Sequence, residues 1–247
     1  MAVPSDNATA WDRYASTYQA GARLPTDVVH FGPDLPDEAS LRLLGDLKGR
    51  RVLDLGCGGG QAAIACAKQR ASVIGVDFSA EQLAIARRLC DQEGVKVELR
   101  HGDLADLAFL NSDSVDLVLS ASALDYVEDI GRVFRQCHRV LKVGAPLVLS
   151  CKHPLWQVLD EDAGTPLLAH RSYFDRTPVD VVREGIVFTE FPHTFADLAL
   201  GLTRASLRLE TIVEPEPDTA GPRSPWWREA HRLVPRTIIF KARKEGN

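Results

Sequence analysis

The sequence lacks any apolar run that approaches the roughly 20 residues needed to cross a lipid bilayer. Residues 1–6 also lack the basic and apolar regions of a secretory signal. These two absences argue against a membrane helix and an exported chain. We therefore expect a cytoplasmic protein that does not bind a membrane.

Paired cysteines are missing as well. The five cysteines are scattered without a C-x-x-C pair, and several have apolar neighbours, where a free thiol behaves as a small hydrophobe. The cysteines are Cys57, Cys66, Cys90, Cys137 and Cys151. This pattern predicts neither a metal site nor disulfide bonds.

The third absence is an excess of basic residues. The chain has 29 Lys and Arg against 34 Asp and Glu, which gives a formal net charge of -5. Because nucleic acids are bound mainly through clustered Lys and Arg, this balance gives no reason to expect a nucleic-acid partner. We expect a small-molecule partner, and a protein that is a monomer or a homodimer.

What the chain does contain is an alternation of short apolar runs and helical patterns. The apolar runs lie near residues 51–55, 72–76, 96–100, 115–120, 145–151, 207–213 and 237–243. Strands that alternate with helices are typical of a parallel sheet with crossover helices. The pattern predicts an α/β fold with a doubly wound, seven-stranded, mostly parallel sheet and helices on both faces.

Helix signals are clear at three places between these runs. Ile130, Phe134 and Cys137 share one apolar face of a predicted helix. Another helix begins at Ser79, whose hydroxyl can accept an amide N–H while Gln82 reaches back in a capping box. A third is predicted at residues 194–204.

Between residues 152 and 193 the alternation breaks. This segment contains prolines, acidic residues and two strand-like stretches, at residues 172–174 and 186–191. A long irregular segment inside a regular fold is typical of a functional loop or lid. We therefore predict an inserted lid after the fifth strand.

The first predicted strand runs directly into a glycine-rich loop. Gly56, Gly58 and Gly60 allow backbone amides to approach a ligand closely and to turn sharply. A tight turn without a ligand also favours glycine, and folds that bind nicotinamide cofactors use a related loop. By itself, the loop predicts a ligand site and leaves the ligand open.

Three acidic residues near the strand ends narrow the choice of ligand. Asp77 closes the second strand, where a carboxylate can accept both ribose hydroxyls or simply cap the strand end. Asp103 follows the third strand, where it could bind an adenine amine beside the apolar Phe78 and Leu104. Asp54 lies inside the first strand, where an acid is costly unless a cation such as a ligand ammonium meets it.

A dinucleotide would make the opposite demand on this loop. Its pyrophosphate requires a helix N-terminus free of carboxylates and a third fingerprint glycine, and Gln61 occupies that position. These residues favour a cationic adenosyl amino acid over a pyrophosphate.

Together, these residues resemble the motifs of class I, Rossmann-like S-adenosylmethionine-dependent methyltransferases of the small-molecule type. The resembling stretches are residues 52–60, 76–77, 102–104, 115–120 and 139–144. The resemblance covers about residues 11–151 and implies S-adenosylmethionine as cofactor and S-adenosylhomocysteine as product. It places Gly56, Gly58 and Gly60 beside the cofactor. It also implies that Asp77 contacts the ribose and that Asp103 and Leu104 contact the adenine. Ser120 and Ala121 would lie beside the methionine moiety, and Tyr14 and Tyr18 would close over its carboxylate.

The sequence departs from that family at two points. Residues 142–145 read Lys-Val-Gly-Ala where the family usually has Pro-Gly-Gly, which affects only a turn. Asp125 and Tyr126 stand where many relatives carry histidine, which weakens any base assigned there.

If the acceptor is a hydroxyl, the candidate bases are His153, after the fifth strand, and His193, before a helix. Each could instead satisfy local backbone groups beside its neighbouring proline.

Aromatic residues predict the substrate pocket. Tyr126, Trp156 and Tyr173 are the candidates, with Trp226 and Trp227 in a late loop, although they could equally form a small core of the insertion. We expect methyl transfer to a small, partly apolar metabolite by in-line displacement. Two alternatives stay open: a binding module that holds the cofactor without turnover, and an enzyme that uses the same cofactor to transfer a different group.

We expect one domain with four parts. They are an N-terminal helical cap at residues 1–45, a cofactor-binding core at 46–151, the lid at 152–193, and a C-terminal helix with the last two strands at 194–247.

Overall fold

The structure is a computed structural model that describes residues 7–161, 164, 166–218 and 222–246. Its centre is a seven-stranded sheet in the order β3-β2-β1-β4-β5-β9-β8. The strands are β1 Arg51–Leu55, β2 Ser72–Asp77, β3 Glu98–His101, β4 Leu117–Ala121, β5 Pro146–Lys152, β8 Leu207–Val213 and β9 Thr237–Lys244. β9 runs antiparallel to both of its neighbours, and the other pairs are parallel. The predicted doubly wound, mostly parallel sheet is confirmed.

The strand order reverses between β1 and β4. From β1 the chain adds β2 and β3 on one side, and β4 then pairs with β1 on the other side. In open α/β sheets, ligands bind outside the carboxyl ends of the strands at such a switch point. The topology therefore places a binding site where the loops after β1 and β4 meet.

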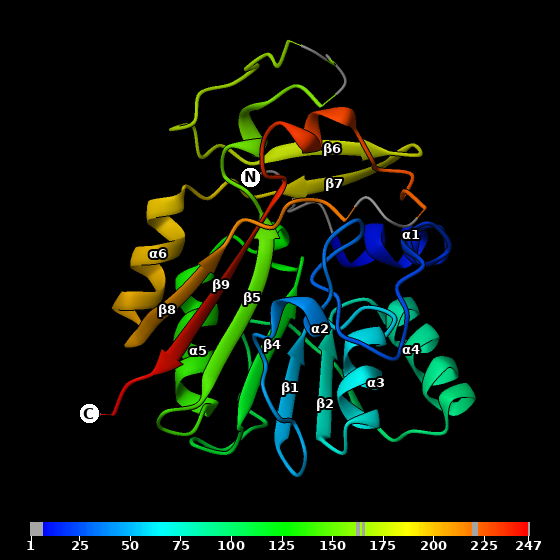
Figure 1. Ribbon diagram of the computed structural model, residues 1–247, viewed down its shortest axis with the longest axis vertical. Coiled ribbons are helices and arrows are strands. Elements are labelled where there is room, and N and C mark those ends of the chain that lie inside the picture. The colour runs from blue at the N-terminus through cyan, green and yellow to red at the C-terminus, as the bar shows by residue number, and fades with distance from the viewer. Residues whose placement is uncertain (1–6, 162–163, 165, 219–221, 247) are drawn as a thin grey trace.

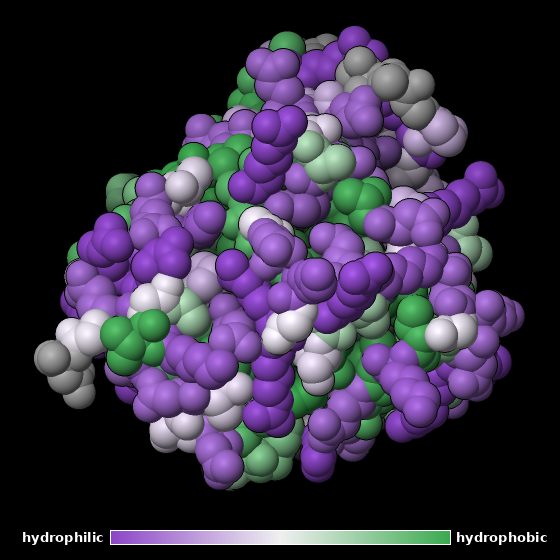
Figure 2. Space-filling model, turned by 60° about the horizontal axis from the view of Figure 1, so that its bottom comes forward, coloured by the Kyte–Doolittle hydropathy of each residue, from purple (hydrophilic) through white to green (hydrophobic). Residues whose placement is uncertain are grey.

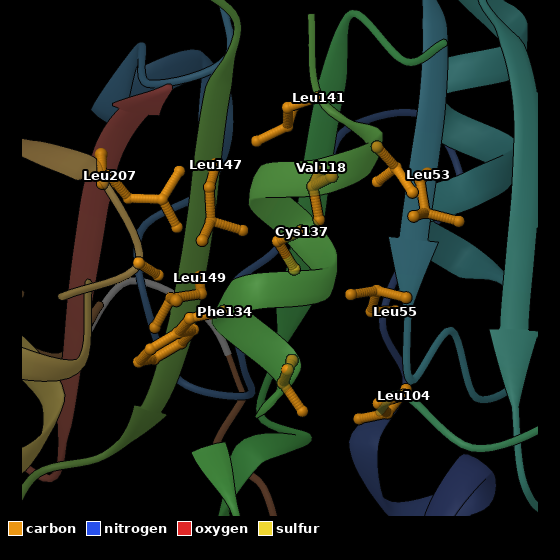
Figure 3. Packing of buried hydrophobic residues seen from close by; sticks show 14 of the residues in the cluster. Leu53, Leu55, Leu104, Val118, Phe134, Cys137, Leu141, Leu147, Leu149 and Leu207 are labelled. Atoms are coloured by element: carbon orange, nitrogen blue, oxygen red, sulfur yellow. The ribbon is translucent and has the colours of Figure 1, made fainter. Parts of the chain in front are cut away.

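Helices cover both faces of the sheet. They are α1 Asn7–Ala22, α2 Glu38–Leu41, α3 Gln61–Lys68, α4 Ala80–Glu93, α5 Ile130–Val140 and α6 Phe195–Arg204, with short 3-10 turns η1 Leu124–Tyr126, η2 Trp156–Val158 and η3 Glu229–Arg232. Because successive side chains of a strand point to opposite faces, Val52 packs with α3 while Leu53 and Leu55 pack toward α5. Figure 3 shows Phe134 of α5 beside Leu149 of β5, and Cys137 of α5 between the leucines of β5 and those of β1.

The predicted helices are present and side chains cap their starts, with one difference from the sequence-based prediction. Asp129 caps α5 and Thr194 caps α6, and Ser79 accepts a hydrogen bond from the N–H of Gln82 at the start of α4. The other predicted contact of the capping box, from the Gln82 side chain back to the Ser79 N–H, is wrong. The side-chain oxygen of Gln82 accepts from Nε2 of Gln19 at 2.8 Å because α1 packs against α4 there.

Helix α1 lies beyond the carboxyl ends of the parallel strands (Figure 1). Its Asp12 holds it to the core: Oδ1 accepts from the Ser79 hydroxyl at 2.6 Å and from the Glu81 N–H at 3.0 Å. Negative charge is favourable at a helix N-terminus, so Asp12 stabilises the start of α4 while it fixes α1. The predicted N-terminal helix thus becomes a cover over the switch point.

The insertion between β5 and α6 contains a separate two-stranded sheet of β6 Val179–Arg183 and β7 Ile186–Glu190. The second predicted strand-like stretch corresponds to β7, but the prediction of a strand at residues 172–174 is wrong. That stretch forms a turn in which the Ser172 hydroxyl accepts from the Phe174 N–H at 3.2 Å. β6 and β7 form an antiparallel hairpin, which we call the hairpin. Figure 1 shows it beside α1 above the seven-stranded sheet.

Figure 2 brings the opposite end of the molecule forward and shows hydrophilic side chains over most of that face, with apolar residues in smaller patches. Within the described residues, no helix is both long and apolar enough to cross a membrane.

Candidate functional site

The glycine loop follows β1 and leads into α3. Gly56 has a φ of +70°, and a Cβ at this position would lie 2.3 Å from the Cβ of Ala123, which follows β4. The first glycine is therefore required both by its backbone conformation and by the close approach of the β4 loop. Gly60, in a left-handed conformation, is the N-cap of α3. The loop occupies the switch point that the topology predicts.

Asp54 lies in a pocket that we call the glycine-loop pocket. Its walls include Tyr18, Asp54, Gly56, Gly58, Gln61 and Ala121. Asp54 is 1% exposed, and its Oδ2 has no hydrogen-bond partner among the described residues. Burial, reinforced by the nearby Asp77 carboxylate, raises the pKa of Asp54 to about 7. A buried acceptor without a donor fits a ligand ammonium, because such a group would supply both the charge and the hydrogen bond.

Asp77 joins the glycine loop to α4. Its Oδ2 accepts from the Gly58 N–H at 2.8 Å, and its Oδ1 accepts from the Ser79 N–H at 2.8 Å. Burial raises the pKa of Asp77 despite these two bonds. Each carboxylate oxygen has a further lone pair, so the same side chain can hold the loop and accept ligand hydroxyls.

A second cavity, the Phe78 pocket, lies among the loops that follow β2, β3 and β4. It is lined by Phe78, Asp103, Leu104, Ala123, Tyr126 and Val127, and has a volume of about 700 Å³. Oδ1 of Asp103 accepts from the Ala105 N–H at 2.8 Å, which orients this carboxylate. The structure brings together the three residues that the sequence assigns to an adenine, while their role stays a prediction.

The two residues assigned to the methionine moiety are placed differently. Ala121 lines the glycine-loop pocket. Ser120 is 2% exposed, and its hydroxyl donates to the Leu55 carbonyl at 2.9 Å. Since this bond joins β4 to the end of β1, the side chain of Ser120 supports the loop from inside the sheet.

A third cavity, the aromatic pocket, lies between α1, the hairpin and the end of β5, with a volume of about 100 Å³. Five aromatic side chains line it: Trp11, Tyr14, Tyr18, Tyr126 and Trp226. The rings of Trp11 and Tyr126 meet edge to face at 5.3 Å, and those of Tyr18 and Trp226 stack at 5.2 Å. Tyr18 also lines the glycine-loop pocket, so the two pockets share a wall.

Charged residues form the remaining walls of the aromatic pocket. Glu190 pairs with Lys152 and Arg183, each at 2.5 Å, and Arg183 donates to the Tyr126 hydroxyl at 2.8 Å. Burial disfavours ionisation, yet Lys152 and Arg183 together lower the pKa of Glu190. Asp125 accepts from the Lys152 N–H, and burial raises the pKa of Asp125 to about 6.

Two of the aromatic residues predicted to line the substrate pocket lie elsewhere. Trp156 is 1% exposed, packs 4.7 Å from the ring of His231, and donates from Nε1 to Glu161. The hydroxyl of Tyr173 accepts from the N–H of Phe195 at 3.0 Å. These contacts stabilise the insertion and the start of α6, and of the three candidates the structure brings Tyr126 to the aromatic pocket.

Both candidate histidines also lie outside the aromatic and glycine-loop pockets. His153 interacts through Nε2 with Glu214 at 3.0 Å and through Nδ1 with the Leu155 N–H at 3.0 Å. Nε2 of His193 contacts the Val127 carbonyl at 2.8 Å, and burial lowers the pKa of His193. With both nitrogens of His153 engaged, this geometry favours a structural role for that side chain.

Several residues of the site are missing from the sequence-based prediction. Trp11 could have been found, because it shares a helix face with Tyr14 and Tyr18 at spacings of three and seven. Arg183, Glu190 and Arg236 carry no local signal, since isolated charges usually mark a solvated surface. Their place in the pocket depends on the hairpin and on β9.

Comparison with known proteins shows which family the core of the chain is similar to. The family described as "Methyltransferase domain" matches residues 52–144. The ubiquinone biosynthesis O-methyltransferase of Bordetella avium is 41% identical over 108 residues, which is 44% of this chain and 45% of that protein. The chain spans less than half the length of the curated relatives it matches.

Solved structures extend the agreement in fold to most of the chain. A structure of an S-adenosylmethionine-dependent methyltransferase from Mesorhizobium loti has a TM-score of 0.69 at 29% identity, covering 83% of this chain and 96% of that chain. A Listeria monocytogenes structure has a TM-score of 0.71 at 22% identity, covering 85% and 97%. The fold is that of the class I, Rossmann-like methyltransferases. The match to the methyltransferase family runs from β1 to the turn after α5, at residues 52–144.

Proposed function

We propose that this protein transfers a methyl group from S-adenosylmethionine to a small, partly apolar metabolite. One observation carries this proposal: Tyr18 lines both a pocket with aromatic walls and the glycine-loop pocket, where Oδ2 of Asp54 has no partner among the described residues. Two adjoining pockets of this kind suit a donor and an acceptor that must meet. The bacterial relatives named as ubiquinone biosynthesis O-methyltransferases support a small acceptor.

The residues present fit the cofactor. Asp54 would bind its ammonium, Asp77 its ribose, and Asp103 its adenine amine, beside Phe78 and Leu104. When bound, S-adenosylmethionine supplies an electrophilic methyl group on a sulfonium. The chain's own contribution is then alignment and exclusion of water, which together can supply much of the rate of such a displacement.

The acceptor would bind in the aromatic pocket. Trp11, Tyr126 and Trp226 offer flat, partly buried apolar walls, and they pack with Ile186 and Phe188 of the hairpin. In this pocket Asp125 is the carboxylate that is not committed to a salt bridge. We assign it the removal of a proton from the acceptor, because a carboxyl of raised pKa is a suitable general base.

A thermal-shift panel of S-adenosylmethionine, S-adenosylhomocysteine, NAD and ATP tests the cofactor, because a ligand that prefers the native state raises the melting temperature. We expect stabilisation by the first two compounds. Stabilisation by NAD alone would overturn the proposal. Methyl-labelled cofactor incubated with fractionated lysate then tests the acceptor, and we expect the label in small molecules.

The same assays distinguish the two alternatives. Cofactor binding without any labelled product would indicate a binding module, and a product that carries a different group of the cofactor would indicate a different transfer. Label recovered in protein or RNA alone would contradict a small acceptor.

We place the activity in the cytoplasm. The five buried free cysteines are consistent with a reducing compartment. We expect the protein to act as a monomer or a homodimer.

A further inference from the structure

Arg236 is a wall residue of the aromatic pocket and lies directly before β9. β9 begins opposite the end of β5, where Thr237 pairs with Lys152. The His153 N–H donates to the Arg236 carbonyl at 2.8 Å, so the backbone of Arg236 is held at the carboxyl end of the parallel strands. Its half-buried side chain lines the same pocket as Tyr18 and Trp226.

The charges of this pocket do not balance. Its walls include two acids, Asp125 and Glu190, and three cations, Lys152, Arg183 and Arg236. With both acids ionised, three positive charges minus two negative charges leave one positive charge in excess. The chain as a whole carries -5, so the surplus is local to this pocket.

The surplus charge resides on Arg236. Lys152 and Arg183 both pair with Glu190. Arg236, in contrast, makes no side-chain hydrogen bond or ion pair within the described part of the chain. Its field reaches the wall shared with the glycine-loop pocket: burial raises the pKa of Tyr18, and the guanidinium groups of Arg236 and Arg183 oppose that rise.

Building on the methyl-transfer function proposed above, we propose that Arg236 binds a carboxylate of the acceptor while the aromatic walls hold its ring. A guanidinium presents a planar fork of donors that matches a carboxylate in a bidentate pair. A single surplus positive charge balances a monoanion, whereas a doubly charged phosphate would be repelled by Asp125 and Glu190. The acceptor class is therefore a small aromatic monocarboxylate.

Matched pairs of probes test this assignment. The carboxylates are 4-hydroxybenzoate, phenylacetate and indole-3-acetate, each paired with its neutral amide of nearly equal shape. Dissociation constants are measured by calorimetry with and without S-adenosylhomocysteine. We expect at least one carboxylate to bind the wild-type protein at least tenfold more tightly than its amide.

Substitutions attribute that preference to one side chain. In Arg236→Gln the ratio of the two dissociation constants should fall to near one, and Arg236→Lys should retain part of it. Arg232→Gln is the matched control, because Arg232 lies four residues earlier, is exposed, and pairs with Glu229. The control should keep the wild-type ratio.

Equal affinity within every pair, or a preference that survives in Arg236→Gln, would overturn the assignment of Arg236. Failure of the proposed function has a different signature, since it would appear as no binding of S-adenosylhomocysteine at all. Because the probe titrations measure binding and are also done without that compound, the two failures are distinguishable.

Discussion

The backbone N–H of Gly58 donates a 2.8 Å hydrogen bond to Oδ2 of Asp77. This contact connects the loop after β1 with the end of β2, two segments that meet only because the strands pair in parallel. Asp77 thus positions the glycine loop through a hydrogen bond within the protein itself. Its effects on the loop and on a ribose can be separated by substitution.

We predict that Asp77→Ala weakens binding of S-adenosylhomocysteine at least tenfold and lowers the melting temperature. The substitution leaves the Gly58 and Ser79 N–H groups without their partner, at a cost of about 1–3 kcal/mol each. Asp77→Asn keeps one acceptor oxygen, so its losses should be intermediate. Calorimetry and thermal unfolding measure both quantities, and wild-type affinity in Asp77→Ala would refute the assigned role.

We predict that Asp54→Asn stabilises the folded protein near neutral pH and weakens the binding of S-adenosylhomocysteine. In the unfolded chain its pKa is near the usual 3.8, whereas burial first, and then Asp77, raises the pKa of Asp54 to about 7 in the folded protein. Between these values the folded state binds more protons, so the free energy of unfolding falls as pH rises from about 4 to about 7. Asp54→Asn should remove this contribution, which amounts to at most ~4 kcal/mol.

The same substitution should weaken S-adenosylhomocysteine binding at least tenfold, because an amide cannot balance an ammonium. Binding to the wild-type protein at pH 6 should release protons as the carboxyl ionises, which calorimetry in buffers of different ionisation enthalpy detects. Asp54→Asn should show a smaller release. A variant that is less stable than wild type at pH 7, or that binds equally well, would contradict this prediction.

We predict that Gly56→Ala destabilises the protein by more than its backbone conformation alone requires. Gly45→Ala is the matched control, since Gly45 has a φ of +72° and no atom within 4 Å of a built Cβ. The control should lose about 1–2 kcal/mol from the left-handed conformation. Gly56→Ala adds the clash with Ala123, and Ala123→Gly in the same chain should recover part of the loss. Equal unfolding free energies for the two single variants, measured in urea, would rule out the clash.

Asp125 should control the pH dependence of methyl transfer. Burial raises the pKa of Asp125 to about 6, so kcat at saturating cofactor should rise with pH up to about 6 and then level off as the carboxylate forms. Asp125→Asn should lower kcat by about 10²-fold or more and remove this inflection. His153→Gln and His193→Gln serve as comparisons and should keep both kcat and the profile. Loss of the inflection in a histidine variant instead would return the base to that histidine.

The sequence predicted the part of the site that depends on local rules. A glycine-rich turn after an apolar strand, an acid at the end of the next strand, and a Ser cap before a helix are each readable within a few residues. Parallel strands place their carboxyl ends at one edge, which is why Asp54, Gly56 and Asp77 lie together as expected. The Ser79 cap is present as predicted, but the return contact from the Gln82 side chain to the Ser79 N–H was wrong. The packed helix α1 supplies Gln19 as the partner of Gln82, while the Ser79 N–H donates to Asp77.

The sequence by itself determined the doubly wound sheet and the glycine loop, because strand periodicity, glycine conformation and a buried acid are properties of short segments. Only the tertiary structure decided the walls of the aromatic pocket. Trp11, Arg183 and Arg236 come from three distant segments, and Trp156, an equally plausible aromatic in the sequence, packs instead on His231. The aromatic residues that contact one another are decided by how α1, the hairpin and β9 pack. The hydrophobic effect is non-directional and stabilises any close apolar contact, so the sequence does not specify the partners.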